Sequence, residues 1–179
     1  MADTTTRSGI VVRAAVAADM SSVAIMLDAY MAELFGCPWQ GSLDTLVRDG
    51  LGSEFQTVVA ERTDDLVGFA CWRRVYDLHH CAAGGEVMDM YIRRRSRGSG
   101  TALSLISFVA AQVQGAGGRF VKGRADATLE QVYARVAVVF SGAECYVGGR
   151  AFRILAQSAG SPPRMLVRGL PSSALNHEH

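Results

Sequence analysis

Apolar residues in this chain recur at two spacings, one typical of helices and one typical of strands. Helical spacing of three and four residues, bounded by capping residues or glycines, predicts helices over residues 20–34, 42–50, 100–113 and 128–140. Short β-branched or alternating runs predict strands over residues 10–13, 55–61, 66–75, 86–92, 120–123, 144–147 and 151–155. Both element types contribute, so a mixed α/β domain is expected.

Polar and glycine-rich stretches predict how these elements connect. Asp19 can cap the first helix, and Gly36 ends it. The turn over residues 63–65 predicts a hairpin between the two strands that flank it. Residues 79–85 are expected to form a loop, and Gly148-Gly149 is a strong signal for a second hairpin.

Length and composition indicate one globular domain. The chain has 179 residues, of which 49% are hydrophobic and 20% are charged, which is typical of a packed core. We expect a flexible N-terminus at residues 1–9, one domain at residues 10–157 and a C-terminal tail at residues 158–179. The formal net charge is only +1, so no overall field favours nucleic acid or an anionic membrane.

The compartment is predicted from cysteines and from the N-terminus. Four cysteines lie far apart without a Cys-x-x-Cys pair, and residues 1–9 lack the pattern of a signal peptide. No apolar run approaches the ~20 residues that a membrane helix needs. We therefore expect a soluble, cytoplasmic protein with reduced thiols and no membrane association.

A strand, a glycine-rich loop and a helix follow one another between Met90 and Leu103. The loop has the sequence Arg97-Gly98-Ser99-Gly100, and Thr101-Ala102 opens the helix. Glycines at a helix start leave several backbone N–H groups free, and the helix dipole adds partial positive charge there. This arrangement favours a phosphate or pyrophosphate group, although strand-to-helix turns also use glycine for conformational reasons alone.

On these residues the chain resembles the GNAT superfamily of acetyltransferases, whose pyrophosphate motif is Gln or Arg, two residues, Gly, one residue, then Gly or Ala. Arg97, Gly100 and Ala102 match this motif. The resemblance extends in element order over roughly residues 10–156. Within the family, the segments at residues 66–70, 76–77 and 89–92 are locally similar to spermidine/spermine N-acetyltransferases.

The resemblance implies an activity, a fold and a cosubstrate. It implies an N-acetyltransferase that uses acetyl-CoA and acts on a small-molecule or peptide amine, and it suggests a homodimer. The implied fold is α/β (α+β), with a mixed, mostly antiparallel sheet flanked by about four helices. The residues implied for CoA are Tyr91, Ile92, Arg93, Arg97, Gly98, Ser99, Gly100, Thr101 and Ala102. Arg93 to Arg95 could meet the 3′-phosphate of CoA, but a solvated basic run is the preferred interpretation.

Acyl transfer to an amine requires a group that removes a proton. A lysine-like ammonium has a pKa of about 10.4, so a carboxylate or a water chain must accept its proton before attack. Glu86 and Asp89 are the candidates, ranked nearly equal. Three residues separate them, which puts them on opposite faces of a regular strand unless a bulge intervenes. The alternative for each is an ion pair with a neighbouring arginine.

One family feature is absent from the expected position. Family members commonly carry a tyrosine near the end of the penultimate helix that protonates the departing thiolate. Alignment on Gly142 and Ala143 puts Val138 at this position, and Tyr133 lies about 140° around a helix from it. An acyl-CoA-binding module without turnover is therefore the alternative function.

Other polar and aromatic residues are interpreted more simply. His79, His80 and Cys81 lack a third ligand at a suitable spacing, so no metal site is expected. Aromatic residues on the strand that ends near Tyr76 are expected to pack in the core. Trp39 follows the first helix in a region that family members use as a substrate wall, so it is the candidate substrate residue.

Overall fold

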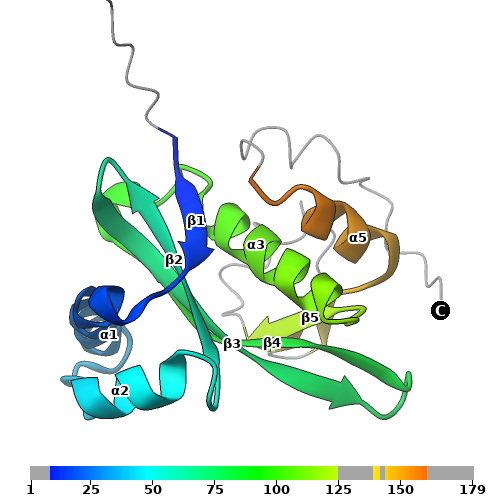
Figure 1. Cartoon of the computed structure of the whole chain (residues 1–179), viewed down its shortest axis with the longest axis horizontal. Helices are drawn as coiled ribbons and strands as arrows, with labels where there is room; N and C mark the ends of the chain where they lie inside the picture. Colours follow the sequence, from blue (N-terminus) through cyan, green and yellow to red (C-terminus); the bar gives the residue numbers. More distant parts are fainter. Residues whose placement is uncertain (1–8, 125–138, 142–143, 161–179) are drawn as a thin grey trace, which may run out of the picture.

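The computed structural model describes residues 9–124, 139–141 and 144–160, and these form a seven-stranded sheet with helices on both faces (Figure 1). The strand order is β1-β2-β3-β4-β5-β7-β6. Neighbouring strands are antiparallel throughout, except for the parallel pair β4 and β5. The mixed, mostly antiparallel sheet expected from the sequence is confirmed.

The elements have well-defined bounds. The strands are β1 (Val11–Ala14), β2 (Gln56–Arg62), β3 (Asp65–Asp77), β4 (Ala82–Ile92), β5 (Val121–Arg124), β6 (Val139–Ser141) and β7 (Glu144–Val147). The helices are α1 (Met20–Phe35), α2 (Leu43–Gly50), α3 (Thr101–Gly115) and α5 (Gly149–Gln157), with 3-10 turns η1 (Ala17–Asp19) and η2 (Arg94–Ser96). Within the described residues, none of these helices has both the length and the apolar character needed to cross a bilayer.

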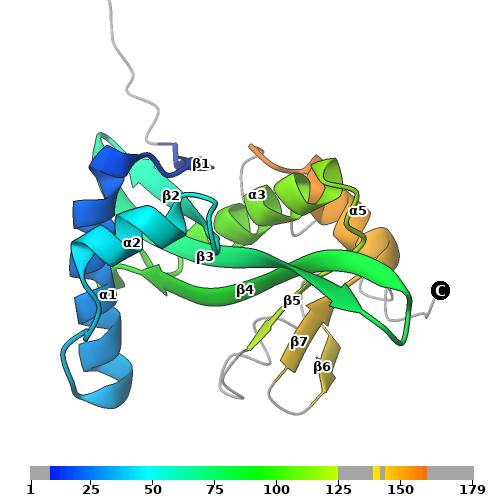
Figure 2. The ribbon, with the colours of Figure 1, turned by 60° about the horizontal axis from the view of Figure 1, so that its bottom comes forward.

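Two hydrophobic cores lie on opposite faces of the sheet (Figures 1 and 2). One core joins α1 and α2 to the sheet, and its fully buried members include Met20, Val23 and Phe69. The other core joins α3 and α5 to the opposite face through residues such as Leu105 and Phe152. The sheet therefore separates an α1/α2 side from an α3/α5 side.

Local signals explain several element ends. The Oγ of Ser42 accepts a hydrogen bond from the backbone N–H of Thr45 at 3.2 Å, which caps α2. Gly36 adopts a left-handed conformation after α1, with φ of 66°. Asp19 does not cap α1 through its side chain; its carboxylate accepts from the Val16 N–H and from Arg13 instead. This ion pair fixes the path from β1 into α1.

Strand β4 begins at Ala82, four residues before the predicted start, so the prediction of a loop over residues 79–85 is wrong in its second half. The small residues at positions 82–85 give no apolar alternation, yet they pair with the end of β3. A Cβ atom on Gly84 would lie 2.6 Å from the Phe120 ring, and one on Gly85 would lie 2.4 Å from Val113 Cγ2. Close packing on both faces of β4 requires glycine here.

The C-terminal elements correct two further predictions. Gly148-Gly149 does not join a hairpin, because residues 149–157 form helix α5, whose buried residues Ala151, Phe152, Leu155 and Ala156 follow helical spacing. Residues 139–140 belong to β6 rather than to the end of a helix, because they pair with β7. The rest of the predicted helix, including Tyr133 and Val138, lies outside the described residues.

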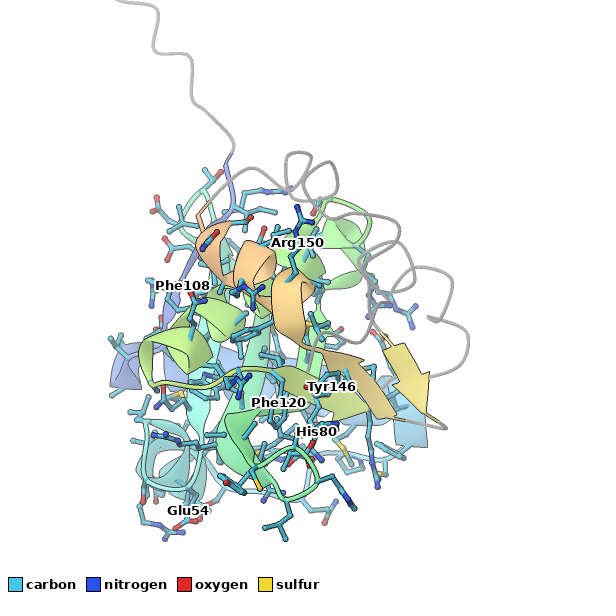
Figure 3. The ribbon with its side chains drawn as sticks, turned by 90° about the vertical axis from the view of Figure 1, so that its right-hand side faces the viewer. Glu54, His80, Phe108, Phe120, Tyr146 and Arg150 are labelled. Carbon is cyan, nitrogen blue, oxygen red and sulfur yellow. The ribbon has the colours of Figure 1, made fainter. Side chains whose placement is uncertain are left out.

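Aromatic stacking joins the last described strands to the loop after α3. The rings of Phe120 and Tyr146 stack with their centroids 5.2 Å apart (Figure 3). Phe120 immediately precedes β5 and Tyr146 belongs to β7, which pairs with β5. The contact therefore stabilises the part of the sheet beyond β4.

Gly85→Ala is expected to lower the free energy of unfolding by about 1–3 kcal/mol, because the added methyl would push Val113 and α3 away from the sheet. Gly115→Ala is the matched control, since a Cβ at the end of α3 meets nothing within 4 Å; its effect should stay within about 0.5 kcal/mol. Urea unfolding followed by circular dichroism measures both. Equal stability of the two variants would contradict the close packing of β4 against α3.

Candidate active site

Strand β4 has a neighbouring strand on both sides only in its middle, and one neighbour elsewhere. It pairs with β3 from Ala82 to Ile92 but with β5 only from Gly85 to Val87. Within the described residues, β4 therefore has an open edge from Met88 to Ile92, where the sheet divides. Backbone N–H and C=O groups along such an edge can bind an extended polar chain.

A bulge interrupts β4 where this open edge begins. Cys71 pairs with Asp89 and Trp72 pairs with Val87, so Met88 is the extra residue. Asp89 and Glu86 lie opposite Cys71 and Arg73, which share one face of β3. The bulge therefore brings both candidate carboxylates to the α1/α2 side, although regular alternation would have separated them.

The two carboxylates have different partners. Glu86 Oε2 accepts from Nε and Nη2 of Arg73, each at 2.9 Å. Asp89 is half-buried, and the Tyr30 hydroxyl hydrogen-bonds to it. Burial raises the pKa of Asp89, and the hydrogen bond from Tyr30 opposes that rise. Of the two carboxylates, Asp89 is thus the one that forms no ion pair with an arginine among the described residues.

A pocket of about 250 Å³ lies between α1, α2 and strands β3 and β4; we call it the α1–α2 pocket. Trp39, the candidate substrate residue, forms part of its wall together with Leu27. Asp89 and Cys71 also line it. Burial raises the pKa of the Cys71 thiol to about 12, so this thiol stays protonated at neutral pH and is no nucleophile there.

The glycine-rich loop leads from β4 into α3 with the backbone conformation that glycine allows. Gly98 and Gly100 have φ of 74° and 86°, and Gly100 is the N-cap of α3. The Ser99 hydroxyl donates to the Ser96 carbonyl at 2.6 Å, and the buried Thr101 hydroxyl donates to the same oxygen at 3.4 Å. These hydroxyls hold the loop, while the first N–H groups of α3 have no carbonyl partner within the helix.

Arginines around the loop form ion pairs, while the side chains of Arg94 and Arg95 remain largely exposed to solvent. Arg94 and Arg97 contact Glu33 at 3.1 and 2.8 Å. Arg93 and Arg95 contact Asp65, Arg93 at 3.4 Å. The run joins the loop to α1 on one side and to the β2–β3 turn on the other.

Glu33 is a functional candidate that sequence reasoning missed. Its carboxylate also accepts from the Tyr91 hydroxyl at 2.9 Å, and Arg97 lies over the Tyr91 ring at 5.4 Å. The hydrogen bond from Arg97 is the main cause that lowers the pKa of Glu33 to about 2. No local sequence signal links Glu33 to residues some 60 positions away, so only the fold reveals this cluster.

The residues expected to bind CoA divide between side-chain and backbone roles. The Tyr91 side chain is buried on the α1/α2 side, whereas Ile92 packs on the α3/α5 side. Arg93 donates its N–H to the Val67 carbonyl at 2.9 Å. The Arg97 N–H donates to the Arg94 carbonyl at 3.2 Å, so the backbone groups left open are those of the β4 edge and the N–H groups of residues 98–102.

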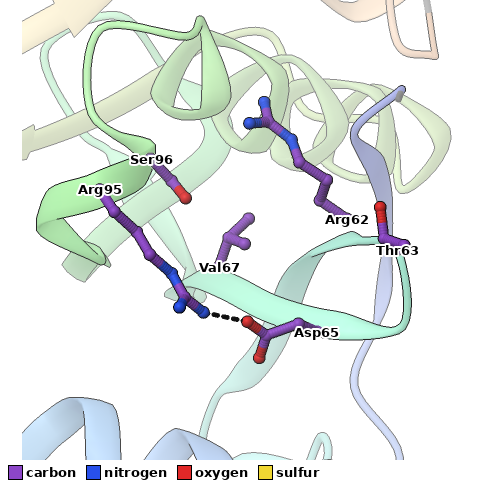
Figure 4. A pocket seen from close by; sticks show the side chains of 6 residues that line it. All are labelled: Arg62, Thr63, Asp65, Val67, Arg95 and Ser96. Atoms are coloured by element: carbon purple, nitrogen blue, oxygen red, sulfur yellow. Dashed lines mark hydrogen bonds and ion pairs between the residues drawn. The ribbon is translucent and has the colours of Figure 1, made fainter. Parts of the chain in front are cut away.

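A second hollow of about 330 Å³ lies beside the loop, between the β2–β3 turn and η2 (Figure 4). Arg95 contacts Asp65 across it, and Ser96 lines its upper wall. The Nε atom of Arg62 is buried and has no hydrogen-bond partner among the described residues. Neither Glu86 nor Asp89 lines this hollow.

The histidine pair lies at the far end of the β3–β4 hairpin. His80 Nδ1 contacts Asp77 at 2.7 Å, and Asp77 also accepts from the His79 N–H. No cluster of three His, Cys, Asp or Glu side chains suited to a metal ion occurs in the part of the chain that the structure describes. The hairpin tip is thus held by hydrogen bonds within itself.

Solved structures with the same fold include several acetyltransferases. An N-acetyltransferase from Staphylococcus aureus Mu50 matches with a TM-score of 0.64 and 13% identity over 79% of this chain and 99% of that one. A ribosomal-protein-alanine N-acetyltransferase from Brucella melitensis biovar Abortus 2308 matches with a TM-score of 0.63 and 18% identity, over 74% and 94% of the two chains. The yncA protein from Salmonella typhimurium, solved with its cofactor acetyl-CoA, matches with a TM-score of 0.62 and 11% identity, over 86% and 97%.

Sequence comparison identifies the family directly. A search of curated proteins gave no significant match. The sequence profile of the acetyltransferase (GNAT) family, in contrast, matches residues 25–133, which is more than half of the chain. This range includes most of α1, the bulged strand β4 and the loop into α3. The chain therefore belongs to the acetyltransferase (GNAT) family.

Proposed function

We propose that this protein is an acetyl-CoA-dependent N-acetyltransferase that transfers the acetyl group to a primary amine by direct attack in a ternary complex. The observation that carries the proposal is the proximity of three features along one stretch of chain. The bulge brings Asp89 into the α1–α2 pocket, the open edge of β4 follows it, and the glycine-rich loop comes next.

The residues around the loop fit CoA. A Cβ atom on Gly98 would meet nothing within 4 Å, so the loop surface is open to a ligand. The N–H groups of residues 98–102 and the α3 dipole suit a pyrophosphate, and the β4 edge from Met88 to Ile92 suits the amides of pantetheine. The thioester of bound acetyl-CoA would supply an activated acyl group.

Asp89 is the proposed proton acceptor. An acceptor amine enters as an ammonium ion, and Asp89 takes its proton so that the nitrogen lone pair can attack the carbonyl carbon. The new N–C bond replaces the C–S bond, and the departing thiolate, whose thiol has a pKa of about 8.5, takes the second proton that the nitrogen loses as the amide forms. Glu86 forms an ion pair with Arg73 on the same face of the sheet, so its negative charge is already compensated.

The Glu33 cluster is proposed to position the loop. It joins Arg94 and Arg97 to the C-terminal part of α1, a helix that also forms a wall of the α1–α2 pocket through Leu27. The ion pairs are largely exposed, so they orient the loop more than they stabilise the fold.

Acetyl-CoA is expected to raise the melting temperature. A ligand that binds only the native state, at one hundred times its dissociation constant, raises the free energy of unfolding by about 2.7 kcal/mol.

Gly100→Asp should abolish this shift in melting temperature, because it adds a charged side chain at φ of 86° where the backbone must approach phosphate. Gly52→Asp is the control, because Gly52 also has positive φ but lies far along the chain between α2 and β2. A folded Gly100→Asp variant with unchanged CoA affinity would show that the loop is only structural.

Asp89→Asn should lower turnover by about 10²- to 10⁴-fold at neutral pH while CoA affinity is nearly unchanged. The loss should shrink as pH rises, because the amine then deprotonates without help. Burial raises the pKa of Asp89. The turnover of the wild-type enzyme should therefore begin to fall, as pH is lowered, at a pH above the ordinary pKa of an aspartate. The assay is CoA thiol release against pH.

Glu86→Gln is the comparison for this experiment and should have the smaller effect, because Glu86 is paired with Arg73. If Glu86→Gln causes the larger, pH-rescued loss, the proton acceptor is Glu86. If neither variant changes the profile, proton removal runs through water or another residue. Absence of thiol release with any amine would instead favour a CoA-binding module without turnover.

Glu33→Gln should weaken CoA binding several-fold and change stability by about 1 kcal/mol or less. The pKa of Glu33 is lowered in the folded state, so its stabilising effect is complete above the ordinary glutamate pKa and is lost as pH falls toward about 2. The stability difference between wild type and variant should therefore disappear toward low pH in urea unfolding. Glu54→Gln, an exposed carboxylate change (Figure 3), is the charge-matched control; an equal loss of CoA affinity in both would contradict the positioning role.

A further inference from the structure

The α1–α2 pocket has an apolar wall built from three separate segments. Leu27 comes from α1, Leu46 from α2 and Phe55 from the turn before β2. Met88, the bulged residue of β4, also lines it. A ligand in this pocket therefore contacts mainly hydrocarbon and aromatic carbon, which favours an apolar body over a polar one.

Trp39 adds an aromatic surface whose position is held locally. Its backbone N–H donates to Asp28 of α1 at 2.9 Å. Its ring packs directly over Gly41, where a Cβ atom would lie 2.2 Å from the ring. Glycine at position 41 thus lets the indole lie flat along the loop at the pocket wall, where it can contact a ring or a cation.

Two carboxylates, Asp49 and Asp89, line this pocket, and only Asp49 is paired with a cationic side chain among the described residues. Asp49 lines the pocket, but Arg48 Nε and Nη2 bind its two oxygens at 2.7 and 2.9 Å. Asp89 is bound by the neutral Tyr30 hydroxyl, whose pKa burial raises to about 12. Among the described residues, no cationic side chain forms an ion pair with Asp89. The pocket therefore offers one uncompensated negative charge.

The volume of the pocket limits the size of the acceptor. About 250 Å³ is below the roughly 300–1,000 Å³ of pockets that enclose drug-sized ligands. A compact body of one ring or one short alkyl chain fits this space, whereas a large polar acceptor would extend beyond it.

We propose that the acceptor is a small monoamine in which one primary amine is carried on a compact aromatic or alkyl body. This inference rests on the proposed function and names its substrate class. The ammonium group pairs with Asp89, and the body contacts Trp39 and Phe55. Asp89 then accepts one proton of the ammonium, the amine nitrogen bonds to the acetyl carbon, and the C–S bond of the thioester breaks. The second proton of the nitrogen leaves with the thiolate, so CoA is released as its thiol.

A polyamine, which the local resemblance to spermidine/spermine N-acetyltransferases would imply, matches this pocket poorly. Its second ammonium would lie against the apolar wall without a carboxylate partner, because Arg48 already neutralises Asp49. Burying an unpaired charge is costly. The second ammonium group of a polyamine, more than its length, therefore distinguishes it from a monoamine in this pocket.

The test compares amines of equal length on the wild-type protein with acetyl-CoA, by CoA release. Hexylamine and 2-phenylethylamine should each show kcat/KM at least about tenfold above that of 1,6-diaminohexane. Equal or better use of the diamine would overturn the monoamine class while leaving the N-acetyltransferase function intact. Acetyl-CoA binding without CoA release for any of the three amines would overturn the proposed function, and this inference with it.

Variants of the pocket wall provide a second readout. Trp39→Ala and Phe55→Ala should raise KM for 2-phenylethylamine by about tenfold and change KM for propylamine much less. Tyr76→Ala, an exposed aromatic on the β3–β4 hairpin, is the matched control and should leave both values unchanged. An equal rise in KM for both amines in the Trp39 and Phe55 variants would contradict recognition of the apolar body. If a variant does not fold, the comparison of amines on the wild-type protein decides the question.

Discussion

The change in the pairing of strand β4 is the constraint on which the rest of the site depends. From Gly85 to Val87 the strand has a neighbouring strand on each side, and beyond Val87 only β3 continues. At the same point the bulged residue Met88 shifts the alternation of side chains. One local irregularity thus opens a backbone edge and turns Asp89 toward the α1/α2 side. With regular alternation, the Asp89 side chain would point to the α3/α5 side instead.

Ion pairs connect the two sides of the candidate site. Glu33 belongs to α1, which helps to enclose the α1–α2 pocket, and it binds arginines of the loop that leads into α3. Asp65 makes the corresponding contacts from the β2–β3 turn. The arginine run is therefore part of the scaffold of the loop, and Glu33 and Asp65 offset only part of the positive charge of these four arginines. Under the proposed function, backbone N–H groups, the helix dipole and this remaining positive charge would all favour a phosphate at the loop.

Features encoded by contiguous residues were predictable from the sequence. Helix α1 has regular apolar spacing and ends at Gly36, and the loop at residues 97–100 has its glycines in sequence. The partners of Glu33 and the bulge at Met88 were not predictable, because they depend on strand register and on contacts between distant segments. Helix α5 was mistaken for a strand because its apolar run is short and follows a pair of glycines that usually signals a hairpin.

The proposal that joins the cofactor side to the acceptor side is that the thioester lies beside the bulge of β4, next to Asp89. A crystal structure of the complex with acetyl-CoA measures this directly. The account predicts pyrophosphate at the N–H groups of residues 98–102 and pantetheine along the edge from Met88 to Ile92. It also predicts an acetyl carbon that an amine bound to Asp89, directly or through one water, can reach. An acetyl group on the α3/α5 side of the sheet, or CoA bound away from this edge, would contradict it.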